Sequence, residues 1–227
     1  MLPFIIAGVA LTSLAAAATA YYKRSGDKED KPTKASLGDI AIWGQQDAGK
    51  TTFIACLRGA PPTSDKKEQT SSIRRYSKFK VTSRDGQPHE IQELLDMPAG
   101  DDRLNNWLTE IETRKHIFYI ITLAKFDDTE YFRKVRTDIA HTVERLKISN
   151  KESKRIHIIG AHLDNSKWKD FEPSRVREKI LQDDGMREIR EHLGKVAGYF
   201  YAANLLDPSS ATRLIEDIID DCAAQLP

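Results

Sequence analysis

The stretch Gly44–Thr52, with the sequence GQQDAGKTT, constrains this chain of 227 residues more than any other part of it. It fits the pattern G-x-x-x-x-G-K-[ST], with Gly44, Gly49, Lys50 and Thr51 at the fixed positions. A loop with few side chains lets successive backbone N–H groups turn inward around a phosphate, while the lysine reaches the terminal phosphates and the hydroxyl binds Mg²⁺. The motif therefore predicts a phosphate-binding loop between a strand and a helix.

The residues on either side of this loop have the character that the motif requires. Residues 39–43, DIAIW, form a short apolar run typical of a buried strand, and residues 51–57, TTFIACL, begin a helical pattern. The N-terminal end of such a helix carries a partial positive charge and attracts a phosphate. A plain glycine turn is the alternative, but it does not explain why a lysine and a threonine both follow Gly49.

Composition excludes some classes of protein. The 35 Lys and Arg residues nearly balance the 34 Asp and Glu residues, so net charge gives no reason to expect nucleic-acid binding. The two cysteines, Cys56 and Cys222, are far apart and form no C-x-x-C spacing, which argues against a disulfide framework and against a cysteine metal site. We expect both to be buried, reduced thiols.

The N-terminal segment differs from the rest of the chain. Residues 2–22 contain no charged side chain and are rich in Leu, Ile, Val and Ala. A helix needs about 20 apolar residues to cross a bilayer, so the segment is long enough. Lys23 and Arg24 follow at once, and the positive-inside rule then places the body of the protein in the cytoplasm. The expectation is a single-pass membrane protein that contacts the lipid bilayer through residues 2–22.

A cleaved signal peptide is the alternative for this segment. Residues 18–20, ATA, resemble a cleavage site, but no Lys or Arg precedes the apolar run as a signal peptide requires. We expect three parts: a transmembrane anchor at residues 2–22, a charged linker at residues 23–36 and a folded domain at residues 37–227.

In the folded part, stretches with strand character alternate with stretches of helical character. This alternation predicts an α/β fold with a mostly parallel sheet and helices on both faces. Asp85-Gly86 is a hairpin signal, which places one antiparallel strand at an edge. The fold class expected is a six-stranded sheet of this kind, preceded by one transmembrane helix. Strands are expected near 39–43, 73–82, 89–96, 116–123, 155–162 and 198–204, and helices from 51, 101 and 127, at 173–193 with a bend near Gly185, and after Ser209 or Ser210.

Polar or small residues follow several of these strands, where ligands of parallel sheets bind. Asp96 leaves an apolar strand, as an aspartate that holds Mg²⁺ in P-loop proteins does. Asp164 follows the fifth strand, and a carboxylate there can accept two hydrogen bonds from guanine, at N1–H and the exocyclic amine. Adenine offers no such pair. Residues 202–204, AAN, form a turn whose backbone N–H groups could meet the guanine O6.

Taken together, these segments resemble the Ras-like small GTPases. Among them the chain is most similar to the Arf-like branch and to the β subunit of the signal recognition particle receptor, which also carries an N-terminal membrane helix. The resemblance covers residues 37–226 and is carried by residues 47–52 (DAGKTT), 95–98 (LDMP), 162–164 (HLD) and 202–204 (AAN). It implies a Ras-like P-loop G domain that binds GTP or GDP together with Mg²⁺.

The resemblance implies a role for each matching position. Lys50 and Thr70 would be catalytic, and Thr51, Thr70 and Asp96 would hold the metal. Thr70 would lie in a loop that closes on Mg²⁺ when a γ-phosphate is present; Thr63 is the second candidate, and a solvated threonine without a role is the other reading. The nucleotide-binding residues would be Gly44, Gln45, Gln46, Asp47, Ala48, Gly49, Lys50, Thr51, Thr52, Gly100, His162, Asp164, Ala202, Ala203 and Asn204.

The chain departs from the family at two loops. The family's second loop reads Asp-x-x-Gly, often followed by Gln, whereas Ala99 and Gly100 stand at the matching positions here. A shift of one residue makes Gly100 the family glycine, and only then could Asp101 stand in for the Gln. The guanine motif usually has Asn or Thr and then Lys before its acid, and here Ala161 and His162 take those places. His162 can still stack on a base.

The function expected from these features is a membrane-anchored GTP-binding switch. It would hydrolyse GTP to GDP slowly and recruit or assemble a protein partner through the loops at residues 59–72 and 96–103. One alternative is a membrane scaffold subunit that stays GTP-bound without cycling, which the missing Gln favours. The other is an ATP-dependent P-loop protein.

Overall fold

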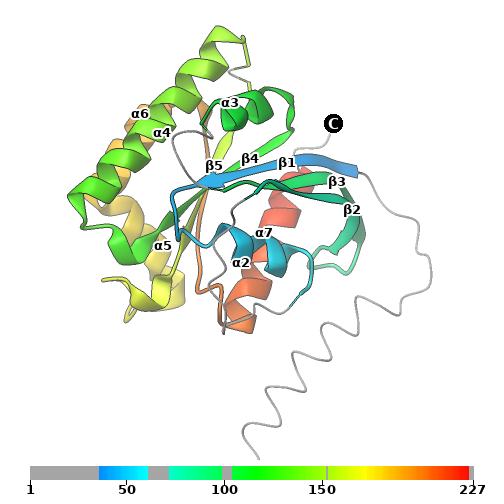
Figure 1. Cartoon of the computed structure of the whole chain (residues 1–227). Coiled ribbons are helices and arrows are strands. Elements are labelled where there is room, and N and C mark those ends of the chain that lie inside the picture. The colour runs from blue at the N-terminus through cyan, green and yellow to red at the C-terminus, as the bar shows by residue number, and fades with distance from the viewer. Residues whose placement is uncertain (1–35, 61–71, 99–103, 152, 225–227) are drawn as a thin grey trace, which may run out of the picture.

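A six-stranded sheet in the order β2-β3-β1-β4-β5-β6 runs through the computed structural model, which describes residues 36–60, 72–98, 104–151 and 153–224 (Figure 1). The strands are β1 (Ser36–Gly44), β2 (Arg74–Thr82), β3 (Pro88–Asp96), β4 (His116–Thr122), β5 (Ile156–Ala161) and β6 (Ala197–Ala202). The α-helices are α2 (Lys50–Leu57), α3 (Leu104–Thr113), α4 (Thr129–Ile148), α5 (Pro173–Gln182), α6 (Asp184–Leu193) and α7 (Pro208–Ala224), and short 3-10 turns are η2 (Leu123–Lys125), η3 (Leu163–Asn165) and η4 (Gly194–Val196).

The sheet has the mixed topology expected from the order of elements. β1 lies at its centre and pairs in parallel with β3 and with β4, and β4, β5 and β6 continue in parallel. β2 is antiparallel to β3 and forms one edge, and Gly86 in the turn between them has a positive φ of 79°. The carboxyl ends of the parallel strands therefore lie at one side of the sheet, where the candidate site is located.

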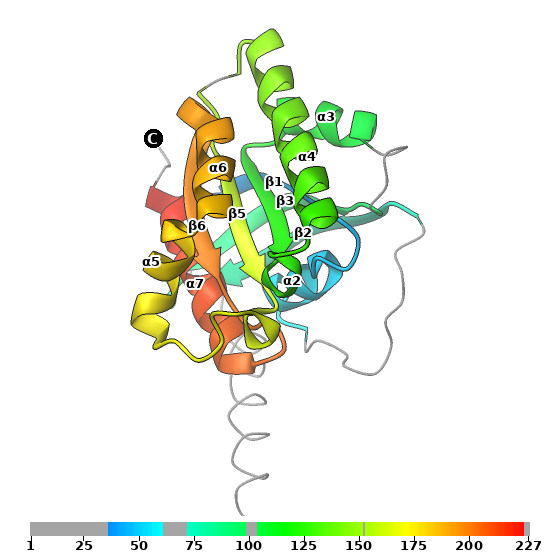
Figure 2. The same ribbon diagram turned by 90° about the vertical axis from the view of Figure 1, so that its left-hand side faces the viewer.

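Side-chain alternation along the central strands divides the core into two layers. Ile40 and Ile42 of β1 belong to a cluster with α2 and α7, whereas Ala41 and Trp43 belong to a cluster with α3, α4, α5 and α6. Because successive residues of a strand point to opposite faces, one apolar strand supplies both layers. Figure 2 shows the same arrangement, with helices on both faces of the sheet.

The transmembrane helix is the part of the expected fold class that requires correction. Among the described residues, no helix is both long enough and apolar enough to cross a membrane. The longest, α4, has 20 residues, but charged side chains such as Arg133, Lys134 and Glu144 recur along it. The anchor expected at residues 2–22 lies outside the described residues, as does the linker up to residue 35. The fold that the described residues show is the six-stranded α/β sheet without a membrane helix.

The region expected to be one bent helix at residues 173–193 forms two helices instead. Asp183 stands between α5 and α6 with an extended backbone (φ −66°, ψ 139°), and its side chain accepts a hydrogen bond from the Gly185 N–H. An aspartate that caps a new helix in this way ends the previous one. The break thus lies at Asp183 and not at Gly185.

Two buried histidines connect the stability of this sheet to pH. His116 of β4 and His157 of β5 are each only 1% exposed. His116 Nε2 lies 2.9 Å from the Leu37 carbonyl oxygen, and His157 Nδ1 accepts a hydrogen bond from the Tyr199 N–H at 3.1 Å. Burial lowers the pKa of both rings from 6.5 to about 4, so both are neutral in the folded protein at pH 7.

We expect the free energy of unfolding to decrease as the pH falls from about 6.5 to about 4. In this range the unfolded histidines bind protons and the folded ones do not, so protons favour the unfolded state. A pKa difference of this size corresponds to about 3 kcal/mol for each ring. Urea unfolding over this pH range should show a smaller decrease for His157→Gln, which keeps an acceptor for the Tyr199 N–H but does not titrate. An equal decrease in wild type and variant would contradict the assignment.

Candidate functional site

The loop between β1 and α2 has a backbone that only glycine permits at its first position. Gly44 has a φ of 150°, and a Cβ there would lie 2.2 Å from the Ile120 carbonyl oxygen of β4. Asp47 and Gly49 also have positive φ values, 60° and 96°. The loop therefore lies close against the end of β4 and then turns into α2, as the G-x-x-x-x-G-K-[ST] spacing predicts.

Lys50 is held at the mouth of this loop by the loop's own backbone. Its Nζ donates to the Gly44 carbonyl oxygen at 2.9 Å and to the Gln45 carbonyl oxygen at 3.0 Å. A lysine ammonium has three N–H donors, so two are bound to the loop and one remains to reach an anion. This geometry fixes a positive charge beside the carbonyl oxygens of Gly44 and Gln45.

Burial makes the Lys50 ammonium costly to the folded protein and suited to binding an anion. Its side chain is buried, which lowers its pKa from 10.5 to about 8, although the carboxylates of Asp96, Asp47 and Asp138 partly oppose this shift. The ammonium is therefore still charged at neutral pH but is incompletely stabilised by the protein. A phosphate in direct contact with the ammonium would offset the cost of its burial.

Thr51 and Asp96 bring two oxygen ligands together beside Lys50. The Thr51 hydroxyl donates to Asp96 Oδ2 at 3.1 Å, and Asp96, at the end of β3, is 1% exposed. Mg²⁺ prefers oxygen ligands and usually takes only one or two from the protein, the rest being water and phosphate. Within the described residues no cluster of three His, Cys, Asp or Glu could hold a metal. The donor set fits Mg²⁺ bound together with a nucleotide, and Thr51 and Asp96 are the residues that could hold it.

The loops that follow β5 and β6 meet the phosphate loop at Gly49. A Cβ at Gly49 would lie 3.4 Å from the Ala161 side chain and 3.3 Å from that of Leu205. The two later loops are also tied to each other, because the Ala203 N–H donates to the Gly160 carbonyl oxygen and the Leu163 N–H to the Ala203 carbonyl oxygen. The structure thus brings together three segments that are far apart in the sequence.

His162 and Asp164 lie in the turn that follows β5. His162 has a left-handed backbone (φ 57°), and its Nε2 lies within 3.6 Å of a Cβ built on Gly49. That nitrogen is buried and has no hydrogen-bond partner in the described part of the chain. Asp164 is exposed, and its Oδ2 accepts a hydrogen bond from the Asn165 side-chain amide at 2.7 Å. The acid expected to recognise guanine is therefore at the edge of the site and open to solvent.

In the turn at residues 202–204, two backbone N–H groups donate to other parts of the protein. The backbone N–H groups of this turn were expected to meet a base, but the Ala203 N–H donates to Gly160 and the Asn204 N–H donates to the Ser210 hydroxyl at 3.0 Å. In this conformation both amides are already used inside the protein. The Asn204 side chain instead accepts from the Leu206 N–H and so closes its own turn.

Some predicted site residues lie outside the described residues. These are Thr70, Thr63 and Gly100, together with Ala99 and Asp101 of the second loop. The rest of the predicted set stands at the carboxyl side of the sheet: Gly44, Gln45, Gln46, Asp47, Ala48, Gly49, Lys50, Thr51, Thr52, Asp96, His162, Asp164, Ala202, Ala203 and Asn204.

Sequence reasoning missed a buried acid that contacts the loop. Asp138 of α4 is 7% exposed, and its Oδ2 accepts a hydrogen bond from the Gln45 side-chain amide at 2.6 Å. A signal existed, because Asp138 stands between Val135 and Ile139 on the apolar stripe of its helix. A charged residue at such a position requires a partner, which the sequence does not identify.

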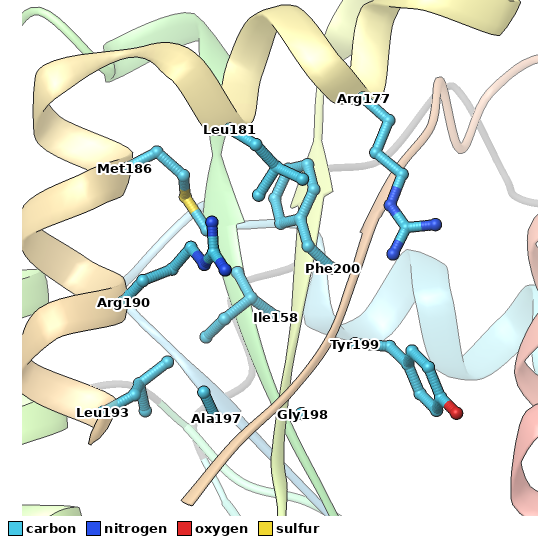
Figure 3. A pocket seen from close by; sticks show the side chains of 10 residues that line it. All are labelled: Ile158, Arg177, Leu181, Met186, Arg190, Leu193, Ala197, Gly198, Tyr199 and Phe200. Carbon is cyan, nitrogen blue, oxygen red and sulfur yellow. The ribbon is translucent and has the colours of Figure 1, made fainter. Parts of the chain in front are cut away.

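A small hollow lies away from this site, between α5, α6 and the first residues of β6 (Figure 3). It has a volume of about 80 Å³ and is lined by apolar side chains such as Leu181 and Phe200, with Arg177 and Arg190 also along its wall. Its lining includes Ala197 and Gly198 at the start of β6, whereas the phosphate loop lies beyond the carboxyl ends of the strands. The hollow is therefore not part of the candidate site.

Comparisons with known proteins identify the fold. No protein-family model matches the sequence, and no curated protein matches it. The structure is similar to that of the Arl6 (BBS3) small GTPase from Trypanosoma brucei, which was solved with the nucleotide analogue GppNp bound. The match has a TM-score of 0.58 and 12% sequence identity, and covers 85% of this chain and 100% of that chain. The part of the chain that the structure describes has the fold of an Arf-like small GTPase.

Proposed function

We propose that this protein binds guanine nucleotides, hydrolyses GTP to GDP slowly and acts as a switch that engages a protein partner. The observation that carries the proposal is the position of Lys50, which two loop carbonyls hold beside Thr51 and Asp96. A buried ammonium on a phosphate-loop motif and two oxygen groups that could hold Mg²⁺ form a site for a nucleoside polyphosphate. The Arf-like protein of the same fold was solved with a GTP analogue, which supports the same class of ligand here.

Guanine is favoured over adenine by the position of Asp164. It stands on the turn after β5, which packs against Gly49 of the phosphate loop through Ala161 and His162. A carboxylate at this place can accept hydrogen bonds from the N1–H and the exocyclic amine of guanine, and adenine offers no such pair.

The residues of the site would stabilise the negative charge that develops during phosphoryl transfer. Lys50 and the loop amides would bind the oxygens of the phosphates. Thr51 and Asp96 would hold Mg²⁺, which would supply positive charge against the phosphate oxygens. The loops at residues 59–72 and 96–103, which follow α2 and β3 in the sequence, would form the surface for the partner.

The nucleotide carried by the full-length protein after purification tests the proposal directly. Denaturation and chromatography should release GDP or GTP in a molar ratio near one. In a competition assay, GDP should displace a fluorescent guanine nucleotide and ATP should not. Displacement by ATP with equal efficiency would exclude the guanine assignment, and absence of any bound or exchangeable nucleotide would refute the proposed function.

We expect the isolated protein to hydrolyse GTP at or below about 10⁻⁴ s⁻¹, the unaided rate of Ras-type proteins. A positioned water is needed, and residues 97–103, MPAGDDR, contain no Gln to orient it. Single-turnover release of phosphate measures this rate, with Lys50→Ala, which should bind nucleotide far more weakly, as the control. A rate near one per second without a partner would contradict the prediction.

The same missing Gln supports a second candidate function, a subunit that stays GTP-bound and assembles with a partner without cycling. The two functions differ in how a partner affects the rate. A switch should be accelerated by a partner that inserts an arginine or a glutamine, by up to about 10⁵-fold. A non-cycling subunit should keep its GTP in the complex, which single-turnover assays with the partner would show.

A further inference from the structure

Asp138 is a buried carboxylate that three groups hold at a single oxygen. Its Oδ2 accepts hydrogen bonds from the Tyr119 hydroxyl at 2.6 Å, from the Gln45 side-chain amide at 2.6 Å and from the Trp43 indole N–H at 3.3 Å. Removing a carboxylate from water is costly unless such donors replace the solvent. Two of these donors lie on core strands, but the third, Gln45, belongs to the phosphate loop.

Gln45 therefore connects the buried acid to the phosphate-binding lysine. Its side chain is held by Asp138, and its backbone carbonyl oxygen accepts from Lys50 Nζ at 3.0 Å and from the Ala48 N–H at 3.3 Å. The side chain and the carbonyl belong to one residue, so a hydrogen bond that holds the Gln45 side chain also restricts the movement of its carbonyl oxygen. The first turn of the loop is thus fixed to α4 and not only to its own strand.

We propose that Asp138 is a positioning residue for the nucleotide. Through Gln45 it holds the carbonyl that places Lys50, and it does not itself contact the ligand. This inference rests on the proposed function, since it concerns how tightly the loop retains a guanine nucleotide. Without Asp138 the loop should sample conformations in which Lys50 is displaced, and the nucleotide should leave faster.

The same turn of α4 also holds α3, the first described helix after residues 99–103. The Thr142 hydroxyl donates to the Asp138 carbonyl oxygen at 2.7 Å and accepts from the Trp107 indole N–H at 2.9 Å. Trp107 stacks on Trp43 with ring centroids 5.7 Å apart. A displaced loop should therefore change the environment of this tryptophan pair, which gives a second readout by fluorescence.

Release of a fluorescent GDP analogue from the full-length protein, chased with excess GDP, tests the inference. We expect Gln45→Met and Asp138→Asn each to release it about tenfold faster than wild type, since each weakens a hydrogen bond to a charged group. The double variant should release it no faster than the faster single variant, because both changes interrupt one connection.

Tyr119→Phe is the matched control. It removes another buried donor to the same Asp138 oxygen, so it should lower the melting temperature but leave release within about twofold of wild type.

The outcomes separate this inference from the proposed function. If the wild type binds no guanine nucleotide, the proposed function fails, and this inference fails with it. If the wild type binds but Gln45→Met releases the analogue at the wild-type rate, only the inference is overturned. Additive effects in the double variant, or equal acceleration in Tyr119→Phe, would show that Asp138 acts only through general stability and would also overturn it.

Discussion

Replacing Lys50 with methionine should weaken guanine-nucleotide binding by about 10²- to 10⁴-fold and at the same time raise the melting temperature of the nucleotide-free protein. Affinity should fall because a charge-assisted contact to phosphate oxygens is lost. Stability should rise because burial lowers the pKa of Lys50 from 10.5 to about 8, so the folded protein holds this ammonium less favourably than water does.

The two opposing contributions to stability can be compared. A pKa lowered by this amount corresponds to about 3 kcal/mol of unfavourable free energy at neutral pH. Methionine removes that cost but also removes the hydrogen bonds to the Gly44 and Gln45 carbonyl oxygens, which contribute about 1 kcal/mol each. The net gain should be about 1 kcal/mol, or a rise of about 2–4 °C in melting temperature for a domain of this size.

Lys154 provides the matched control. Within the described part of the chain its Nζ also donates to backbone carbonyls, those of Ile111, Glu112 and Arg114 at the end of α3, but it lies outside the candidate site. Burial lowers the pKa of Lys154 as well, but its side chain is only partly buried and donates to three carbonyls. Lys154→Met should therefore lower the melting temperature, because the last carbonyls of a helix lose their donor, and should leave nucleotide affinity unchanged. Thermal unfolding of nucleotide-free samples and titration with a fluorescent GDP analogue measure both quantities. A lower melting temperature for Lys50→Met would contradict the argument.

The parts of the fold that depend on neighbouring residues could be predicted from the sequence. The unbroken apolar run at 116–123 predicted a strand covered on both faces, and every residue of β4 is buried. Asp85-Gly86 predicted the hairpin that makes β2 antiparallel to β3. The division of residues 173–193 at Asp183 could not be predicted, because a capping aspartate and a solvated one look alike in sequence.

In the candidate site, too, only the residues that a local sequence pattern marks could be predicted. The phosphate loop and Asp96 were recognisable because a motif or the end of a strand marks them locally. Asp138 was not, because its contact with Gln45 joins residues 93 positions apart and depends on how α4 packs on β1 and β4. The amides of Ala203 and Asn204 were assigned to a ligand, but tertiary contacts to Gly160 and Ser210 already use them. Composition could not show this, since hydrogen bonds between distant loops leave no local pattern.

Exchanging Asp164 for asparagine should change the base that the protein prefers. The carboxylate is expected to accept two hydrogen bonds from guanine, and asparagine presents an N–H group where one acceptor was. Losing this charged pair should cost about 2–4 kcal/mol, which is about 30- to 1000-fold in affinity for GTP. Xanthine has a carbonyl in place of the amine, so the new N–H group can donate to it and affinity for XTP should rise.

The structure allows this change to be tested without disturbing the fold. Asp164 is exposed, and the turn around it is held by other groups, since the Ser166 N–H and hydroxyl both donate to the Leu163 carbonyl oxygen. Asn165→Ala is the control, because it removes the Asp164 side-chain partner at 2.7 Å but leaves the carboxylate in place. Titrations with GTP, XTP and ATP should show a reversal between GTP and XTP in Asp164→Asn and guanine preference in Asn165→Ala. Unchanged GTP affinity in Asp164→Asn would remove this residue from base recognition and leave His162, whose buried Nε2 has no partner among the described residues, as the first group to test.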